Sequence, residues 1–160
     1  MIEIVPFQSR HAAAFAEINR AWLDAFGIYE EADGKHLYSP QASILAPGGE
    51  IHVAEEQGRV VGTVALVPSV DGEFELAKLA VSPAVRGRGL GRRLATLAIG
   101  RARQRGAVRV VLSSSSKLGV ALALYESLGF RYLALPAESP YDTADVYMAL
   151  ELCAAPSGNG

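Results

Sequence analysis

The chain has 160 residues, half of them hydrophobic, and a formal net charge of −2 at pH 7. This length predicts one domain, with a core large enough to fold without a disulfide or a structural metal. Cys153 is the only cysteine, so an intrachain disulfide is excluded and a reducing compartment is favoured. We interpret Cys153 as an apolar filler and not as a catalytic thiol.

No apolar run is long enough to span a membrane, and residues 1–10 contain an acid and a proline where a secretion signal would be basic and then apolar. We therefore expect a cytoplasmic protein without membrane contact. A single domain should occupy residues 1–152, and the small and polar residues 153–160 should form a flexible tail. The sequence is compatible with a homodimer but does not determine the oligomeric state.

Hydrophobic periodicity and turn residues predict an alternation of strands and helices. In chain order the expected elements are a strand over 2–7, helices over 9–26 and 30–39, strands over 51–56, 60–67 and 73–81, a helix over 90–105, a strand over 108–113, a helix over 117–128, and strands over 130–135 and 144–150. This order predicts a mixed α/β domain with a mostly antiparallel sheet. The unit over 73–113 should form a right-handed parallel crossover.

Apolar spacing also predicts which side chains three of the helices bury. They are Phe15, Ile18, Trp22, Ala25 and Phe26 in the first helix, Leu90, Leu94, Leu97 and Ala98 in the third, and Leu118, Ala121, Leu122 and Tyr125 in the last.

The most informative stretch runs from Leu79 to Leu94, where an apolar strand ends at Pro83 and alternating glycines lead into a leucine-periodic helix. Glycines at 87, 89 and 91 allow a tight turn in which several N–H groups converge on one anion at the positive end of the helix dipole. This arrangement predicts a loop that binds a pyrophosphate.

Two familiar phosphate-binding loops do not fit this stretch. A P-loop for ATP or GTP would end in Gly-Lys-Ser/Thr, whereas this loop ends in Gly91-Arg92-Arg93. A dinucleotide fingerprint needs Gly-x-Gly-x-x-Gly and an acidic residue about twenty positions later, but Arg92 stands three residues after Gly89 and the next strand ends in serines.

The remaining pattern, Arg86-x-x-Gly89-x-Gly91, resembles the pyrophosphate loop of the GCN5-related N-acetyltransferases. Their second signature, a helix written Ala-x-x-Leu-Tyr-x-x-x-Gly-Phe, has its counterpart about thirty residues later, from Ala121 to Phe130. The resemblance covers residues 50 to 150 firmly and the first fifty only in general layout. It implies a mostly antiparallel sheet that is splayed at the cofactor site, and an enzyme that transfers an acetyl group from acetyl-coenzyme A to an amine.

Within this family the chain looks like a small, stand-alone, bacterial-type branch. The resemblance implies that the strand Leu79-Ala80-Val81 pairs its backbone with the pantetheine arm and polarises the thioester carbonyl. It further implies that the loop binds the pyrophosphate, through Arg86, Gly87, Arg88, Gly89, Leu90, Gly91 and Arg92. Many relatives carry an asparagine at the position of Ser115, so one contact to the arm is expected to be lost although the hydroxyl can still bond.

Basic residues are concentrated around this loop: eight of the fifteen Lys and Arg residues lie between 86 and 109, with no acid among them. Those that flank the glycines, including Arg93, would complement a pyrophosphate and a ribose 3′-phosphate. Arg101, Arg103 and Arg105 fit a solvated helix face. A DNA-binding module is the weaker alternative, because the overall balance is acidic and no aromatic residue interrupts the patch to stack on bases.

Two residues are the candidates for acid and base chemistry. Tyr125 matches the family's general-acid tyrosine, although its helical spacing alone would make it a core aromatic. Glu75 lies at a place where some family members carry a catalytic glutamate, and the period of two puts it on the same strand face as Leu79 and Val81. An exposed strand carboxylate is an equally good interpretation of Glu75, and Glu73 and Glu126 are poorer candidates.

The acceptor is less well determined than the donor. We expect a primary amine of a small molecule or amino acid, attacked directly in a ternary complex. A protein N-terminus or a lysine is the second choice, and a non-catalytic acyl-coenzyme A sensor is a further alternative. Trp22, Tyr29, Tyr38 and Tyr141 come from segments that form the acceptor roof in the family, but core packing is the better interpretation of each.

No metal site is expected, because His11, His36 and His52 are scattered without the spacing of metal ligands.

Overall fold

The computed structural model describes residues 1–137, 139 and 141–152, and the predictions for Cys153 and the tail over 153–160 lie outside these residues. The strands are β1 (Ile2–Pro6), β2 (Glu50–Glu56), β3 (Arg59–Pro68), β4 (Glu73–Val81), β5 (Arg109–Ser114), β6 (Arg131–Leu133) and β7 (Val146–Glu151). The α-helices are α1 (Ala12–Ala25), α2 (Glu31–Tyr38), α3 (Leu90–Gln104) and α4 (Gly119–Ser127). Short helical turns over Ser9–His11, Gln41–Leu45 and Pro83–Val85 precede α1, follow α2 and precede α3.

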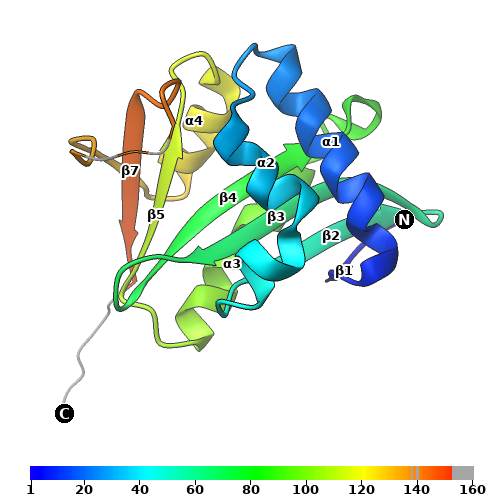
Figure 1. Cartoon of the computed structure of the whole chain (residues 1–160), viewed down its shortest axis with the longest axis horizontal. Helices are drawn as coiled ribbons and strands as arrows, with labels where there is room; N and C mark the ends of the chain where they lie inside the picture. Colours follow the sequence, from blue (N-terminus) through cyan, green and yellow to red (C-terminus); the bar gives the residue numbers. More distant parts are fainter. Residues whose placement is uncertain (138, 140, 153–160) are drawn as a thin grey trace.

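The strands form one sheet in the order β1-β2-β3-β4-β5-β7-β6. Helices α1 and α2 cover one face of this sheet, and α3 and α4 lie behind the other (Figure 1). Each face buries its own core, because Phe15 and Leu37 pack on the first, whereas Leu94 and Tyr125 pack on the second. The predicted mixed α/β class, with a mostly antiparallel sheet, is confirmed.

The sheet is split between β4 and β5, the neighbouring strands that run parallel. Their pairing covers only residues 73–75 of β4 against 109–111 of β5. Beyond Glu75, strand β4 stays paired with β3, and beyond Val111, strand β5 stays paired with β7. The two strands therefore diverge and leave backbone groups of both facing a gap, as the ribbon in Figure 1 shows.

A β-bulge interrupts β4 beside this split. Ala77 pairs with Ala65 and Ala80 pairs with Thr63, so three steps along β4 match two along β3. Lys78 absorbs the extra residue with a φ of 52°, in the left-handed region that L-residues seldom adopt. The bulge bends β4 away from β5 and reverses which side chains face which layer.

The structure corrects several expected details of the helices. The N-terminal helix begins with a 3₁₀ turn, and α1 buries Phe15, Ala16 and Asn19 while Ala25 is exposed. The polar Asn19 is buried because its amide donates to Thr63 Oγ1 at 2.9 Å. In α4 only Tyr125 is fully buried, since the split leaves Ala121 and Leu122 at its edge. Leu97 of α3 is half-buried, and Ala95, Ile99 and Ala102 join the core in its place.

Candidate active site

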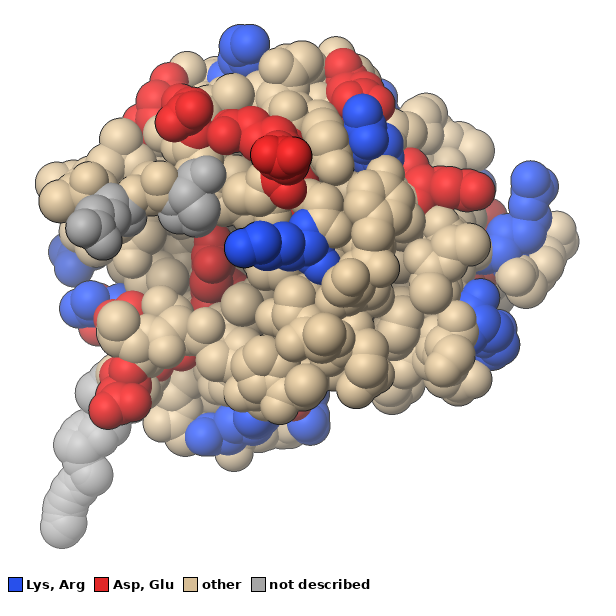
Figure 2. Space-filling view, viewed as in Figure 1, with Lys and Arg blue, Asp and Glu red and all other residues tan. Residues whose placement is uncertain are grey.

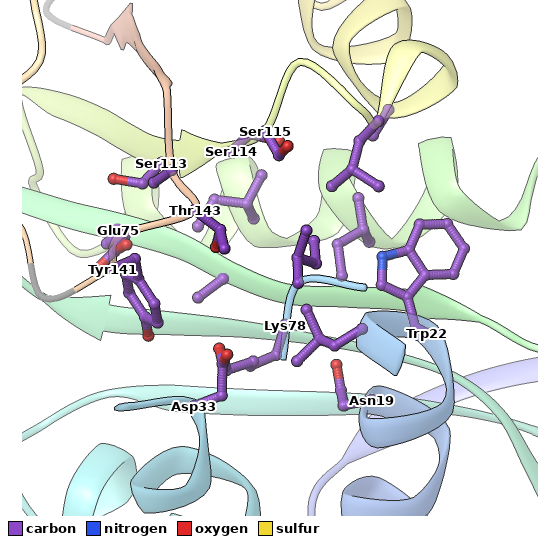
Figure 3. A pocket seen from close by; sticks show the side chains of 18 of the residues that line it. Asn19, Trp22, Asp33, Glu75, Lys78, Ser113, Ser114, Ser115, Tyr141 and Thr143 are labelled. Atoms are coloured by element: carbon purple, nitrogen blue, oxygen red, sulfur yellow. The ribbon is translucent and has the colours of Figure 1, made fainter. Parts of the chain in front are cut away.

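A cavity of about 120 Å³ fills the split between β4 and β5. Residues 75–79 of β4 form its floor. Residues 113–115 at the end of β5 form one wall together with α4, and α1 forms the other wall together with the start of α2. Residues 141–144 close it at one end, so side chains far apart in the sequence converge there (Figure 3). The labelled lining residues are Asn19, Trp22, Asp33, Glu75, Lys78, Ser113, Ser114, Ser115, Tyr141 and Thr143.

Tyr125 lies on the α4 side of this cavity and is only 8% exposed. Its ring packs edge-on against Phe130, with the ring centroids 5.8 Å apart. Burial raises the pKa of Tyr125, so the phenol stays protonated at neutral pH. A general acid must carry its proton at neutral pH, and Tyr125 does so at the edge of the cavity, although its raised pKa makes it a weaker acid than an exposed tyrosine.

Glu75 lies on the cavity floor, at the last residue where β4 pairs with β5. Desolvation by burial raises the pKa of its carboxyl, and the positive charge of Lys78 opposes that rise. A carboxylate with a raised pKa accepts a proton more readily than a solvent-exposed one. Glu73 and Glu126 are engaged elsewhere, with Arg109 at 3.2 Å and with the Tyr132 hydroxyl.

The prediction that Glu75 shares a strand face with Leu79 and Val81 is wrong. Glu75 pairs with Val67, which packs on the core beneath α1 and α2, whereas Leu79 and Val81 pack on the core beneath α3. The bulge at Lys78 is the reason, because one extra residue reverses the alternation of side chains. The cavity nevertheless collects Glu75 and Leu79 together, since it opens through the split in the sheet.

A buried ion pair joins the floor of the cavity to α2. Lys78 Nζ lies 2.5 Å from Asp33 Oδ1, and the two side chains are 8% and 4% exposed. The backbone carbonyl of Lys78 accepts a hydrogen bond from Thr63 Oγ1 at 2.8 Å. Because Thr63 also accepts the Asn19 amide, a chain of hydrogen bonds holds the bulge against α1.

The end of the cavity is closed by contacts between α2 and the segment before β7. Glu30, the residue before α2, accepts hydrogen bonds from the backbone N–H groups of Asp142 and Thr143 and from the Thr143 hydroxyl. Tyr141 lies within this segment, with Lys78 Nζ 5.6 Å from its ring centroid. Figure 3 shows Tyr141 next to Glu75.

Tyr38 is 58% exposed, so its interpretation as core packing is wrong, whereas Trp22 and Tyr141 are half-buried and line the cavity. Tyr29, only half-buried, carries the guanidinium of Arg20 over its ring. Lys78 and Asp33 lie at the centre of the site and were not among the predicted residues. Their distance in sequence hides their pairing, and nothing in the local pattern marks the bulge.

The predicted phosphate loop connects β4 to α3. Gly87 and Gly89 adopt positive φ angles of 82° and 76°, and Gly89 is the residue before the first turn of α3. Gly91 lies inside the helix, where an added Cβ would only touch Leu124 and Val81. The first N–H groups of α3 have no partner within the helix, so this end of a 15-residue helix can receive an anion.

The arginines around the loop differ in how they are held. Arg88 pairs with Glu56 at 2.9 Å, Arg92 donates to Ser127 at 2.7 Å and Arg93 donates to the Ile2 carbonyl at 3.3 Å. Arg86 lies over the ring of Trp22, 5.4 Å from its centroid. Farther along α3, Arg101 and Arg105 both bond Glu50, so they serve packing between α3 and β2 and not a solvated face alone.

Ser115 is buried at 4% exposure and lines the cavity. Its Oγ accepts the backbone N–H of Lys117 at 3.2 Å. Next to it, the backbone and hydroxyl of Ser116 bond Asp145, which fixes the turn after β5. Ser115 is therefore in position to reach a ligand in the split, with its oxygen partly engaged by the turn.

Among the described residues, no helix is both long and apolar enough to cross a membrane. The same residues contain no group of three or more His, Cys, Asp and Glu side chains placed to hold a metal ion. The predicted lack of a metal stays a prediction.

The site of this α/β protein thus combines a sheet split at its parallel pair, a helix end suited to an anion and a buried tyrosine beside the gap. The family model described as Acetyltransferase (GNAT) family matches residues 13–130, and the chain belongs to this family. The family resemblance that the two motifs predicted is confirmed.

The curated relatives that the chain resembles are named N-acetyltransferases. The chain is 40% identical over 90 residues to an uncharacterized N-acetyltransferase, YjgM, of Escherichia coli K12, over 54% of each chain. It is 34% identical over 120 residues to N-acetyltransferase family 8 member 3 of Rattus norvegicus, over 69% of this chain and 53% of the relative. The chain thus spans about half the length of the curated relatives it matches.

Solved structures match over nearly the whole chain. An acetyltransferase of the GNAT family from Staphylococcus aureus Mu50 superposes with a TM-score of 0.88 at 21% identity, covering 96% of this chain and all of that one. The yncA protein of Salmonella typhimurium, a putative acetyltransferase solved with its cofactor acetyl-CoA, superposes with a TM-score of 0.71 at 27% identity, covering 98% of both.

Proposed function

We propose that the chain is an acetyl-CoA-dependent N-acetyltransferase that acts on a primary amine of a small molecule or amino acid, by direct attack in a ternary complex. The observation that carries the proposal is the split between β4 and β5, with a protonated tyrosine on one wall and a carboxylate on the floor. Family membership and the 27% identical relative that holds acetyl-CoA support the identity of the donor.

The residues present fit this donor. Gly87 and Gly89 provide a turn that only glycine adopts without strain, at the positive end of α3, and Arg86, Arg88 and Arg92 supply cationic groups around it. The edge of β4 from Leu79 to Val81 offers backbone groups to an extended arm, and Ser115 faces the same gap. Acetyl-CoA, when bound, supplies the acetyl group as an activated thioester.

The side chains then divide the proton transfers. Glu75 takes a proton from the attacking amine, directly or through one water, and its raised pKa favours this transfer. Tyr125 gives a proton to the departing sulfur of coenzyme A. A thiol has an ordinary pKa of about 8.5, so at neutral pH coenzyme A leaves more easily as the protonated thiol than as the thiolate. A backbone N–H of β4 at the bulge can hold the carbonyl oxygen as negative charge grows on it.

The surroundings of the cavity favour a small, basic acceptor. Acidic side chains gather along the upper edge of the face shown in Figure 2, while Lys and Arg lie in the middle of that face and around its rim. A cavity of about 120 Å³ suits an amine and its near neighbours. A protein N-terminus or lysine is the second candidate acceptor, and the single cysteine supports a cytoplasmic location.

Release of free thiol from acetyl-CoA across a panel of amines tests the proposal. With the best acceptor, Tyr125→Phe should lower kcat about a hundredfold, because the variant keeps the packing against Phe130 and loses only the proton donor. Tyr132→Phe is the matched control, since this exposed tyrosine bonds Glu126 and is not among the described residues that line the cavity. Acetyl-CoA binding without turnover on any amine would identify a sensor, and unchanged turnover in Tyr125→Phe would remove the assigned acid.

A further inference from the structure

Lys78 combines three features that the proposed acid and base do not explain. It has a left-handed backbone in the middle of a strand, its ammonium is buried, and it lines the cavity between the two layers of the site. A lysine at positive φ is costly for the fold, and a buried ammonium is costly unless it is paired. Strain and buried charge that persist together at a cavity point to a role in that cavity.

The ion pair of Lys78 connects strand β4 of the sheet to helix α2. Asp33 receives Lys78 Nζ on Oδ1 and the backbone N–H of Glu30 on Oδ2, at 2.5 and 2.9 Å. Glu30 in turn holds Thr143 and its neighbours, so the chain of contacts continues to the segment that carries Tyr141. The ammonium of Lys78 thus links the bulge of β4 to the start of α2 and, through Glu30, to residues 141–144, the two segments that close this end of the cavity.

The same ammonium is the positive charge that acts on Glu75. Burial raises the pKa of Glu75, and Lys78 is the cation that lowers it again. The other charged or titratable groups around this end include Asp33, His36 and Lys35 of α2, Glu30 before α2, Tyr141 of the closing segment, and Tyr147 of β7 with Glu73 and Arg109 beyond it. Within the described residues, Lys78 is the only lysine or arginine that lines this cavity.

We propose that Lys78 is a positioning residue of the acceptor site: its ammonium ties the start of α2 to the bulge of β4 and supplies the positive charge of the cavity that Glu75 also lines. This role rests on the proposed function, because Glu75 matters only if it receives the proton of an acceptor. Lys78 itself transfers no group and needs no contact with the acetyl donor.

The test separates charge from packing with four variants of the full chain. Lys78→Met keeps the length of the side chain and loses the charge, and Asp33→Asn with Lys78→Met removes both partners, so that no lone charge stays buried if the single variant fails to fold. Lys78→Arg restores the charge. Lys35→Met is the matched control, because Lys35 is an exposed lysine on α2, the helix that carries Asp33.

The first measurement is the titration of the Glu75 carboxyl by ¹³C NMR, with Glu75→Gln identifying its resonance. Glu75 should titrate at higher pH in Lys78→Met and in the double variant than in the wild type, because the favourable charge is gone. Lys78→Arg should move the titration back towards the wild-type value, and Lys35→Met should leave it in place. A wild-type titration of Glu75 in the double variant would overturn the proposal.

The second measurement is the pH profile of kcat/KM with the amine acceptor that the thiol-release screen identifies, and in particular its acid limb. The limb should move to higher pH in the same two variants, and kcat/KM at neutral pH should fall about tenfold. Neither effect is expected from a purely structural ion pair, whose loss would change stability and leave the limb in place. If wild-type protein fails to bind acetyl-CoA in a calorimeter, the proposed function fails separately, since the Glu75 titration needs no ligand.

Discussion

At the scale of single residues, His36 on α2 is the clearest acid-sensitive group. Its Nδ1 is buried without a hydrogen-bond partner among the described residues. Burial, together with the charge of Lys78 and Lys35, lowers the pKa of His36 to about 4, against an opposing effect of Asp33. The folded protein therefore holds this imidazole neutral at a pH where the unfolded chain would protonate it.

Because the unfolded chain protonates His36 more readily than the folded protein does, acid lowers the free energy of unfolding. This contribution of His36 to stability is complete above the unfolded pKa of about 6.5 and is lost as the pH falls from there towards 4. Between pH 7 and pH 5 this single group should cost the wild type about 1 to 2 kcal/mol of folding free energy. In His36→Leu the loss over the same interval should be smaller by that amount, as urea unfolding at the two pH values would measure.

The remaining acid sensitivity in that interval has a second source in His52, whose pKa burial also lowers. Stability at pH 7 should be unchanged or slightly higher in His36→Leu, because the orphaned nitrogen disappears. An equal loss of stability in variant and wild type between pH 7 and pH 5 would show that His36 protonates freely in the folded state.

Residues that a local motif marks could be singled out from the sequence, and residues that depend on distant partners could not. Tyr125 was singled out because its helix has a recognisable sequence, and its catalytic role stays a prediction. The face of Glu75 was mispredicted because alternation assumes a regular strand, and the bulge at Lys78 breaks it. Asp33 is 45 residues from Lys78, so their pairing exists only in the folded chain.

At the scale of elements, the predicted phosphate loop leads into α3, and its turn depends on Gly87 and Gly89. Gly89 has a φ of 76° immediately before the helix, while Gly100, near the middle of the same helix, has open space around its Cβ position. Alanine costs about 1 to 2 kcal/mol in a left-handed conformation but gains about 0.5 to 1 kcal/mol over glycine inside a helix.

Gly89→Ala should therefore destabilise the protein and also weaken acetyl-CoA binding, about tenfold if the helix end yields to relieve the strain. Gly100→Ala should raise stability and leave the dissociation constant of acetyl-CoA unchanged. Thermal unfolding and calorimetric titration of both variants would measure the two effects. Equal affinities in Gly89→Ala and wild type would show that the backbone at this turn does not contact the ligand.

The order and type of elements followed from periodicity, whereas their ends followed from tertiary contacts. The strand over 73–81 was predicted with its observed bounds, because turn residues flank it. The strand over 130–135 shrinks to Arg131–Leu133, since only these residues find partners on β7. The five-residue helical turn at Gln41–Leu45 had no signal in the pattern beyond the proline before it.

At the scale of the whole molecule, the split divides the sheet into two parts joined by few backbone pairs. Strands β1 to β4 form one part and β5 to β7 the other. Strand pairing between them covers residues 73–75 and 109–111, and the Val108 N–H adds a bond to the Gly72 carbonyl at 2.8 Å. The rest of the connection passes through α3, and through contacts such as Arg109 with both Glu73 and Glu151. The two parts should therefore open relative to one another more easily than either part unfolds.

A ligand that lies along β4 inside the split would bond backbone groups that now face the gap, and it would join the two parts. We predict that acetyl-CoA slows amide hydrogen exchange in residues 76–81 and 112–115, and not in the hairpin of β2 and β3, which is already paired along its length. At a hundredfold excess over its dissociation constant, the ligand should also raise the free energy of unfolding by about 2.7 kcal/mol. Protection confined to residues 86–91 would mean that the pyrophosphate binds while the arm stays outside the sheet, and the placement of the thioester between Tyr125 and Glu75 would then be wrong.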